Sequence, residues 1–199
     1  YKSRLMLKAV KPLVLLTIIS FFFFNSDAQL KLPMANGIAN DVKKVIEDYP
    51  NRFINLMGEV LNQHSQSTDY YCNFKVNGAE EAFVTRYSAK KEVCSWEALM
   101  LTTEHFEKAK QRFKSLYNQL QNMVVKFGDN SYKLKGEYDA PDESKKFTSV
   151  LFSFEPANNP AAKLKIEVSM QYIEPMEWKV KLMVYDRDRE DDERGQTKE

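Results

Sequence analysis

The sequence lacks the short motifs that usually mark hydrolases and nucleotide-binding proteins. It contains no G-x-S-x-G, H-E-x-x-H, G-x-x-x-x-G-K or G-x-G-x-x-G stretch. Paired acids such as Glu80-Glu81 fall in predicted turns, where a carboxyl group is not desolvated as a general acid requires. No catalytic residue is therefore predicted. An enzyme whose site assembles from distant residues remains open as an alternative.

Glycine and proline are scarce, with six and seven residues respectively in a chain of 199. This scarcity excludes collagen-like and low-complexity classes. Hydrophobic residues make up 43% of the chain and are spread along it, which argues against disorder. The chain is long enough to bury the core of one globular domain.

Cysteine and histidine are scarcer still, with only Cys72, Cys94, His64 and His105. Zinc ligands usually come in pairs about two to five residues apart, and these four are scattered, so no metal or cofactor is predicted. A disulfide depends on the strand order. In a simple meander the strands that carry Cys72 and Cys94 would lie about 10 Å apart, too far for a bridge. A disulfide and two buried thiols both remain open.

The first 28 residues have the three parts of a secretory signal peptide. The basic residues are Lys2, Arg4, Lys8 and Lys11, and the apolar run extends from Leu13 to Phe24. Ser26 and Ala28 suit a cleavage site before Gln29. The run is shorter than the roughly 20 apolar residues that cross a bilayer, and no lipid-attachment cysteine follows the cut. We expect a secreted or periplasmic protein without a stable membrane anchor.

Charge is nearly balanced in the remainder of the chain, with 25 basic and 27 acidic residues after residues 1–28 are removed. Nucleic acid and anionic membranes both attract a basic face, so neither is an expected partner. The expected partner is a protein or a small ligand.

Two segments have the apolar period of a helix. The first stripe runs from Ile38 to Leu61 and is interrupted at Pro50, which predicts a kinked helix or two helices in tandem. The second segment starts after a cap at Thr102 or Thr103 and ends at Gly128-Asp129-Asn130. Its apolar face extends from Phe106 to Val124.

Strand patterns fill most of the rest of the chain. Alternation of apolar and polar residues predicts seven strands, near residues 70–76, 83–87, 92–100, 132–138, 147–154, 164–172 and 178–184. The order α-βββ-α-ββββ predicts an α+β fold in which two helical segments cover one face of an antiparallel sheet. We expect one domain over residues 29–185 and a charged, disordered tail over residues 186–199.

Four aromatic residues crowd the first predicted hairpin: Tyr70, Tyr71, Phe83 and Tyr87. Because side chains alternate along a strand, Tyr70 and Tyr71 cannot both face the core. One of them meets solvent, a packed loop or a partner, and tyrosine is common at recognition surfaces. The sequence thus favours an exported, non-catalytic binding module that uses its sheet face or a helix–sheet groove. The alternatives are an exported enzyme and a structural subunit of an envelope complex.

Overall fold

The computed structural model describes residues 37–88, 92–127, 129–157, 161 and 163–186. The predicted signal peptide, the start of the mature chain and residues 187–199 of the predicted tail lie outside the described residues. Asp186, which the sequence assigned to that tail, lies in a strand, and its carboxylate accepts a hydrogen bond from the Tyr49 hydroxyl at 2.7 Å. Among the described helices, none is both long and apolar enough to cross a membrane.

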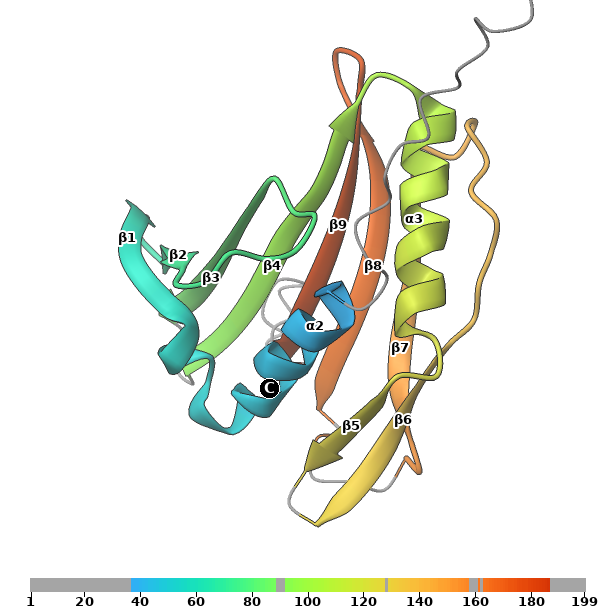
Figure 1. The fold of residues 1–199 in the computed structure, drawn as a ribbon. Coiled ribbons are helices and arrows are strands. Elements are labelled where there is room, and N and C mark those ends of the chain that lie inside the picture. Colours follow the sequence, from blue (N-terminus) through green and yellow to red (C-terminus); the bar gives the residue numbers. More distant parts are fainter. Residues whose placement is uncertain (1–36, 89–91, 128, 158–160, 162, 187–199) are drawn as a thin grey trace, which may run out of the picture. The chain divides into compact units, whose positions relative to one another are not determined.

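Two α-helices, α2 (Gly37–Glu47) and α3 (Phe106–Leu120), accompany a large antiparallel sheet (Figure 1). Short 3-10 turns η2 (Tyr49–Asn51) and η3 (Ile54–Leu56) follow α2. The strands in the described part are β1 (Met57–Gln63), β2 (Ser67–Cys72), β3 (Glu81–Ser88), β4 (Glu92–Thr103), β5 (Val124–Phe127), β6 (Asn130–Gly136), β7 (Phe147–Glu155), β8 (Leu164–Ile173) and β9 (Glu177–Asp186).

These strands form one sheet of nine in the order β1-β2-β3-β4-β9-β8-β7-β6-β5. Each half of the described chain is a helix followed by a meander of antiparallel strands, and the two halves join where β4 pairs with β9. The two halves have no similarity in amino-acid sequence, so they resemble each other only in the order of their helices and strands.

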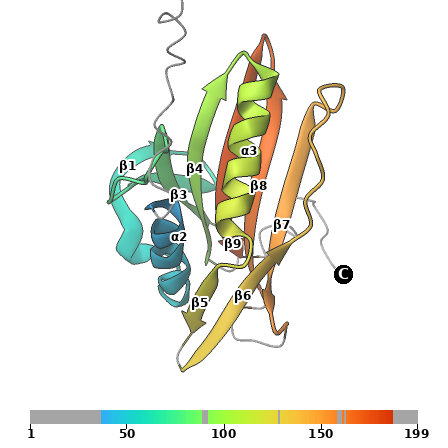
Figure 2. The same ribbon diagram turned by 45° about the vertical axis from the view of Figure 1, so that its right-hand side comes forward.

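Both helices pack on the same side of the sheet, which curves around α3 (Figures 1 and 2). The side chains between the layers form the core. One row of it crosses five strands and contains Val84, Trp96, Val184, Ile166 and Phe152. From α3, Phe113, Leu116 and Leu120 meet this core and are fully buried. The predicted α+β class, with helices on one face of an antiparallel sheet, is confirmed.

The predicted strand number and order are wrong in two places. Residues 57–61, predicted as the end of a helix, form most of β1, the edge strand next to β2. The helical stripe is broken before them because Pro50 has no N–H and because Arg52 and Phe53 adopt left-handed backbone conformations. The Asp48 carboxylate fixes this turn, since it accepts hydrogen bonds from the side chains of Asn51 and Asn55 at 2.8 and 2.6 Å.

The second correction concerns Val124, which the sequence placed on the apolar face of the second helix. Helix α3 ends at Leu120, and Asn122 has a φ of 69°. The N–H of Asn122 then donates to the carbonyl of Leu134, and Val124 begins β5. The order is therefore α-ββββ-α-βββββ.

Candidate functional site

The four aromatic residues of the predicted hairpin divide between the two sides of the sheet. Tyr71 lies opposite Phe83, and Tyr87 is on the same side of β3 as Phe83, away from the helices. Tyr71 is 50% exposed, and Phe83 and Tyr87 are half-buried. Tyr70 points to the helix side, where the Arg86 guanidinium lies 5.6 Å from the centre of its ring. Three of the four thus share the side away from the helices, but only Tyr71 and Phe83 are direct neighbours, because Tyr87 lies four residues further along β3, opposite Ser67.

The side of the sheet that faces away from the helices, here called the open face, continues from Tyr71 across the molecule. Its central row follows from the strand register: Tyr71, Phe83, Glu97, Met183, Glu167 and Leu151. None of these six belongs to the core between sheet and helices. Further along β7, Phe147 lies on the same side as Leu151 and is 54% exposed.

Opposite charges are paired at the centre of the open face. The Lys181 ammonium lies 2.7 Å from the Glu97 carboxylate, and Glu97 is the less exposed partner, with 13% of its side chain accessible. The Tyr185 hydroxyl donates to Glu167 at 2.9 Å. These pairs fix the orientation of both carboxylates. The open face therefore combines aromatic groups toward one edge with satisfied charges in the middle.

A smaller polar cluster lies beside the aromatic group. The Thr85 hydroxyl donates to one oxygen of Asp69 at 2.7 Å, and His64 Nε2 lies 3.5 Å from the other oxygen. In this arrangement the carboxylate lies between the hydroxyl and the imidazole. A nucleophile activated by histidine needs the imidazole next to the hydroxyl, so the cluster is not built for that chemistry.

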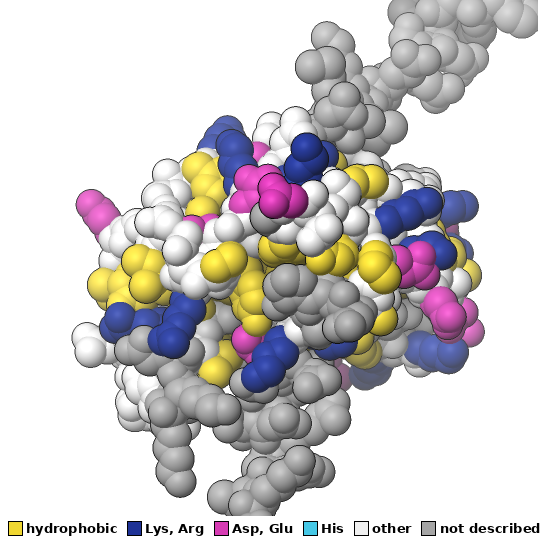
Figure 3. All heavy atoms as spheres, turned by 90° about the horizontal axis from the view of Figure 1, so that it is seen from below, with side chains coloured by type: hydrophobic (Ala, Val, Ile, Leu, Met, Phe, Trp, Pro, Cys, Tyr) yellow, Lys and Arg dark blue, Asp and Glu magenta, His cyan; other side chains and the backbone are white. Residues whose placement is uncertain are grey.

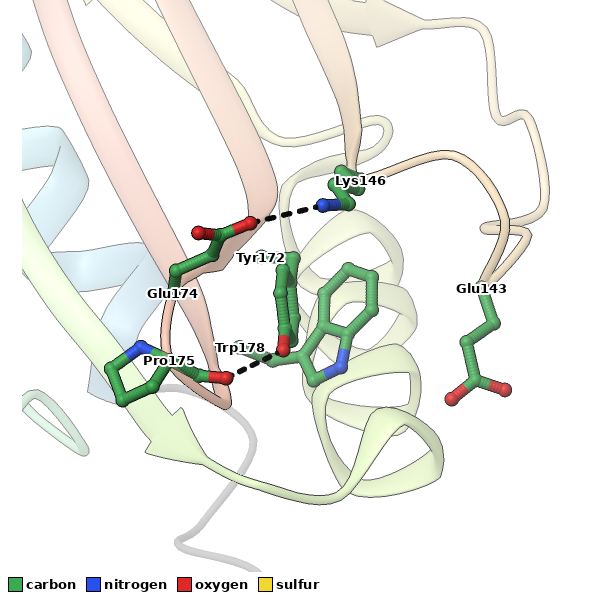
Figure 4. Close-up of a pocket in the computed structure, with 6 residues that line it drawn as sticks. All are labelled: Glu143, Lys146, Tyr172, Glu174, Pro175 and Trp178. Atoms are coloured by element: carbon green, nitrogen blue, oxygen red, sulfur yellow. Dashed lines mark hydrogen bonds and ion pairs between the residues drawn. The ribbon is translucent and has the colours of Figure 1, made fainter.

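A shallow pocket of about 520 Å³ opens at the turn between β8 and β9 (Figure 4). The aromatic part of its wall is Tyr172 and Trp178, in an edge-to-face contact with ring centres 5.3 Å apart. Phe106, the first residue of α3, supports Trp178 from another side at 5.2 Å. The pocket is thus preformed by rings that hold one another in place.

Charged side chains form the rim of this pocket. The Lys146 ammonium lies 3.4 Å from the Glu174 carboxylate and 5.4 Å from the centre of the Tyr172 ring. The Tyr172 hydroxyl donates to the Pro175 carbonyl at 2.9 Å. Glu143 contributes a carboxylate from the loop before β7. In that loop, two hydrogen bonds from Ser144 hold the pKa of Asp142 below its usual value.

The cysteines are not joined in a disulfide. Strand β3 lies between β2, which carries Cys72, and β4, which carries Cys94. Tyr71, next to Cys72, lies opposite Phe83, whereas Cys94 lies opposite Arg86, three residues further along β3. The two cysteines are thus separated by about 10 Å across two strand spacings and at least as much along the strands. A bridge needs Cα atoms within about 7 Å. In the described ranges, no group of three or more histidine, cysteine or acidic side chains is placed to hold a metal ion.

No protein-family model, no curated protein and no solved structure matches this chain. The sequence pointed to Tyr71, Phe83 and Tyr87 but not to the pocket, whose residues come from the separate segments 143–146 and 172–178. The one local signal for the pocket is the turn Glu174-Pro175 between Tyr172 and Trp178.

Proposed function

We propose that this chain is an exported, non-catalytic binding module that holds a partner protein on the open face of its sheet. The observation that carries the proposal is the position of Tyr71, half exposed and beside Phe83 on a face that the helices leave uncovered. Tyrosine binds partners well because its ring is apolar, its hydroxyl is polar and few rotatable bonds must be ordered.

The exposed side chains of the open face lie far apart, at Tyr71 on β2 and at Leu151 on β7, while Ser95, Ser169 and Tyr185 between them are buried; this spread supports a protein partner over a small ligand. The central row of the open face spans six strands, or about 24 Å at the usual strand spacing of about 4.8 Å. That width is on the scale of a standard protein interface, which covers about 800 Å² on each partner. Small ligands instead bind in concave pockets that surround most of their surface. The opposite charges of Glu97 and Lys181 add orientation without a net charge.

The proposal is tested by affinity capture from the secreted or periplasmic fraction of the host, with wild-type protein and two variants as bait. Tyr71→Ala removes the exposed ring, and a partner bound on the open face should be lost or weakened by roughly tenfold, as for an aromatic anchor at an interface. Val60→Ala is the matched control because Val60 is 56% exposed on the edge strand β1 and lies opposite Tyr70, on the other side of the sheet from the open face. Thermal melts of both variants establish that they are folded.

The decisive result is the difference between the baits. A protein that wild type and Val60→Ala retain and Tyr71→Ala loses supports the proposal, and cross-links from Lys181 to that protein would map the contact. Equal capture by all three baits would remove the open face from consideration as the binding surface.

A second candidate function is that of a structural subunit in an envelope complex. The end of the molecule seen in Figure 3 carries a band of hydrophobic side chains that is bordered by both basic and acidic side chains. Apolar surface of this kind favours stable association. Light scattering at several concentrations distinguishes the two functions, because a structural subunit should assemble with itself or co-purify in fixed stoichiometry, whereas a binding module should remain monomeric without its partner.

A further inference from the structure

The pocket at the turn between β8 and β9 contains a hydrogen-bond donor that has no acceptor in the described part of the chain. The indole N–H of Trp178 has no hydrogen-bond partner among the described residues, and Figure 4 shows its nitrogen on the side of the ring nearer to Glu143. The ring itself is 5% exposed and held between Phe106 and Tyr172. This donor is therefore fixed in direction, as a ligand-binding group must be.

The rim adds a donor and an acceptor side by side. Lys146 and Glu174 are 3.4 Å apart, with 66% and 80% of their side chains exposed, so a ligand can reach both. The pair presents an ammonium that donates hydrogen bonds and a carboxylate that accepts them. Glu143 provides a further acceptor across the pocket.

These groups disfavour three classes of ligand. An anion would be repelled by the carboxylates of Glu143 and Glu174, and a simple organic cation would compete with Lys146 for the face of Tyr172. A wholly apolar ligand would cover the Trp178 N–H and the charged rim without replacing their hydrogen bonds to water.

The geometry points to a carbohydrate site, in which a neutral sugar unit packs its apolar C–H face against Tyr172 and the accessible edge of Trp178. Two neighbouring hydroxyl groups of the sugar bridge the rim pair, one donating to Glu174 and the other accepting from Lys146. The Trp178 N–H donates to a third oxygen. The volume of about 520 Å³ suits a sugar unit, and the open mouth leaves room for a chain to extend from it.

The site is distinct from the open face, so its test does not depend on the proposed function. The chain contains two tryptophans, Trp96 and Trp178, and each gives one indole signal in a ¹⁵N–¹H NMR spectrum. The probes are neutral oligosaccharides that end in glucose, galactose, mannose or N-acetylglucosamine. One of them should shift the Trp178 signal saturably and leave the signal of the fully buried Trp96 in place. Trp178→Phe assigns the two signals.

Variants of the wall and the rim connect the shift to the pocket. Tyr172→Ala should weaken sugar binding by roughly tenfold, whereas Tyr172→Phe should retain it, because the hydroxyl is already bound to the Pro175 carbonyl. Glu174→Ala, on an exposed side chain that folding does not need, should weaken binding even if Tyr172→Ala is unfolded. Tyr71→Ala, on the open face, should bind sugar like the wild type.

Three outcomes would overturn the assignment. The first is a Trp178 signal that no neutral sugar shifts. The second is a signal that responds to tetramethylammonium but not to sugars, which would make the pocket a site for organic cations. The third is sugar binding that survives both Tyr172→Ala and Glu174→Ala.

Discussion

One oxygen of the Asp41 carboxylate, on α2, accepts two hydrogen bonds from Asn77, one from its backbone N–H at 2.8 Å and one from its side-chain amide at 2.7 Å. Asp41 is 4% exposed, so this pair joins α2 to the connection between β2 and β3 away from bulk water. The Asp41 carboxylate is thus the acceptor for the backbone N–H of Asn77.

Replacement of Asp41 by Ala should therefore reduce the free energy of unfolding by about 1–3 kcal/mol, since it leaves a part-buried N–H without its acceptor. Urea denaturation measures the loss. Asn40→Ala is the control because Asn40 is an exposed neighbour on the same helix. A loss no larger than that of the control would mean that water replaces the carboxylate at little cost.

Replacement of Trp96 by Phe should lower the free energy of unfolding less than the complete burial of this side chain would suggest. Its ring is fully buried in the core, yet its Nε1–H has no hydrogen-bond partner in the described part of the chain. Trp96→Phe removes this unsatisfied donor and leaves a small cavity, and the two effects oppose each other at about 1 kcal/mol each. We expect a free energy of unfolding within about 1 kcal/mol of wild type, and a loss of about 3–5 kcal/mol for Trp96→Ala. Equal losses for both variants would contradict this prediction.

The pKa of Asp142 should depend on Ser144. The Ser144 hydroxyl and backbone N–H both donate to Asp142, and these bonds are the main reason why its pKa is lowered. Ser144→Ala should raise that pKa toward the usual value in a carboxyl-carbon NMR titration, whereas Ser144→Thr should keep it low. Because the folded-state pKa is the lower one, the contribution of Asp142 to stability is present above the unfolded pKa and disappears as the pH falls through the folded value. An unchanged pKa in Ser144→Ala would assign the shift to the nearby Lys145 and Lys110 instead.

Thiol titration should give two thiols per chain when protein that has never been reduced is unfolded in denaturant. The reason is the strand register, which keeps Cys72 and Cys94 too far apart to form a bridge within one molecule. In the native state Cys94 should react more slowly than Cys72, because Cys94 is buried and Cys72 is half-buried. The absence of thiols in the unfolded, unreduced monomer would show that the register of β2 or β4 is different.

Sequence patterns predicted the strands best where alternation is strict. Residues 164–172 alternate throughout and form β8, because one side of that strand meets α3 while the other belongs to the open face. The pattern failed at Met57 and Val124, which continue a helical period by coincidence. Their strand conformation depends on pairing with the next strand along the chain, β2 for Met57 and β6 for Val124, and the helical period within one segment does not reveal that pairing. For the candidate site, too, the sequence pattern left out what strand pairing decides. Alternation required that Tyr70 and Tyr71 point to opposite sides, but only the register with Val84 and Phe83 decides which one is exposed.

The position of β9 sets the order in which this chain can acquire its structure. The last strand of the described chain lies in the interior of the sheet, between β4 and β8. Until Glu177 and the residues after it are available, the earlier strands can form only two partial sheets, each with an uncovered edge. A nascent chain must therefore wait for its C-terminal part before the fold can close.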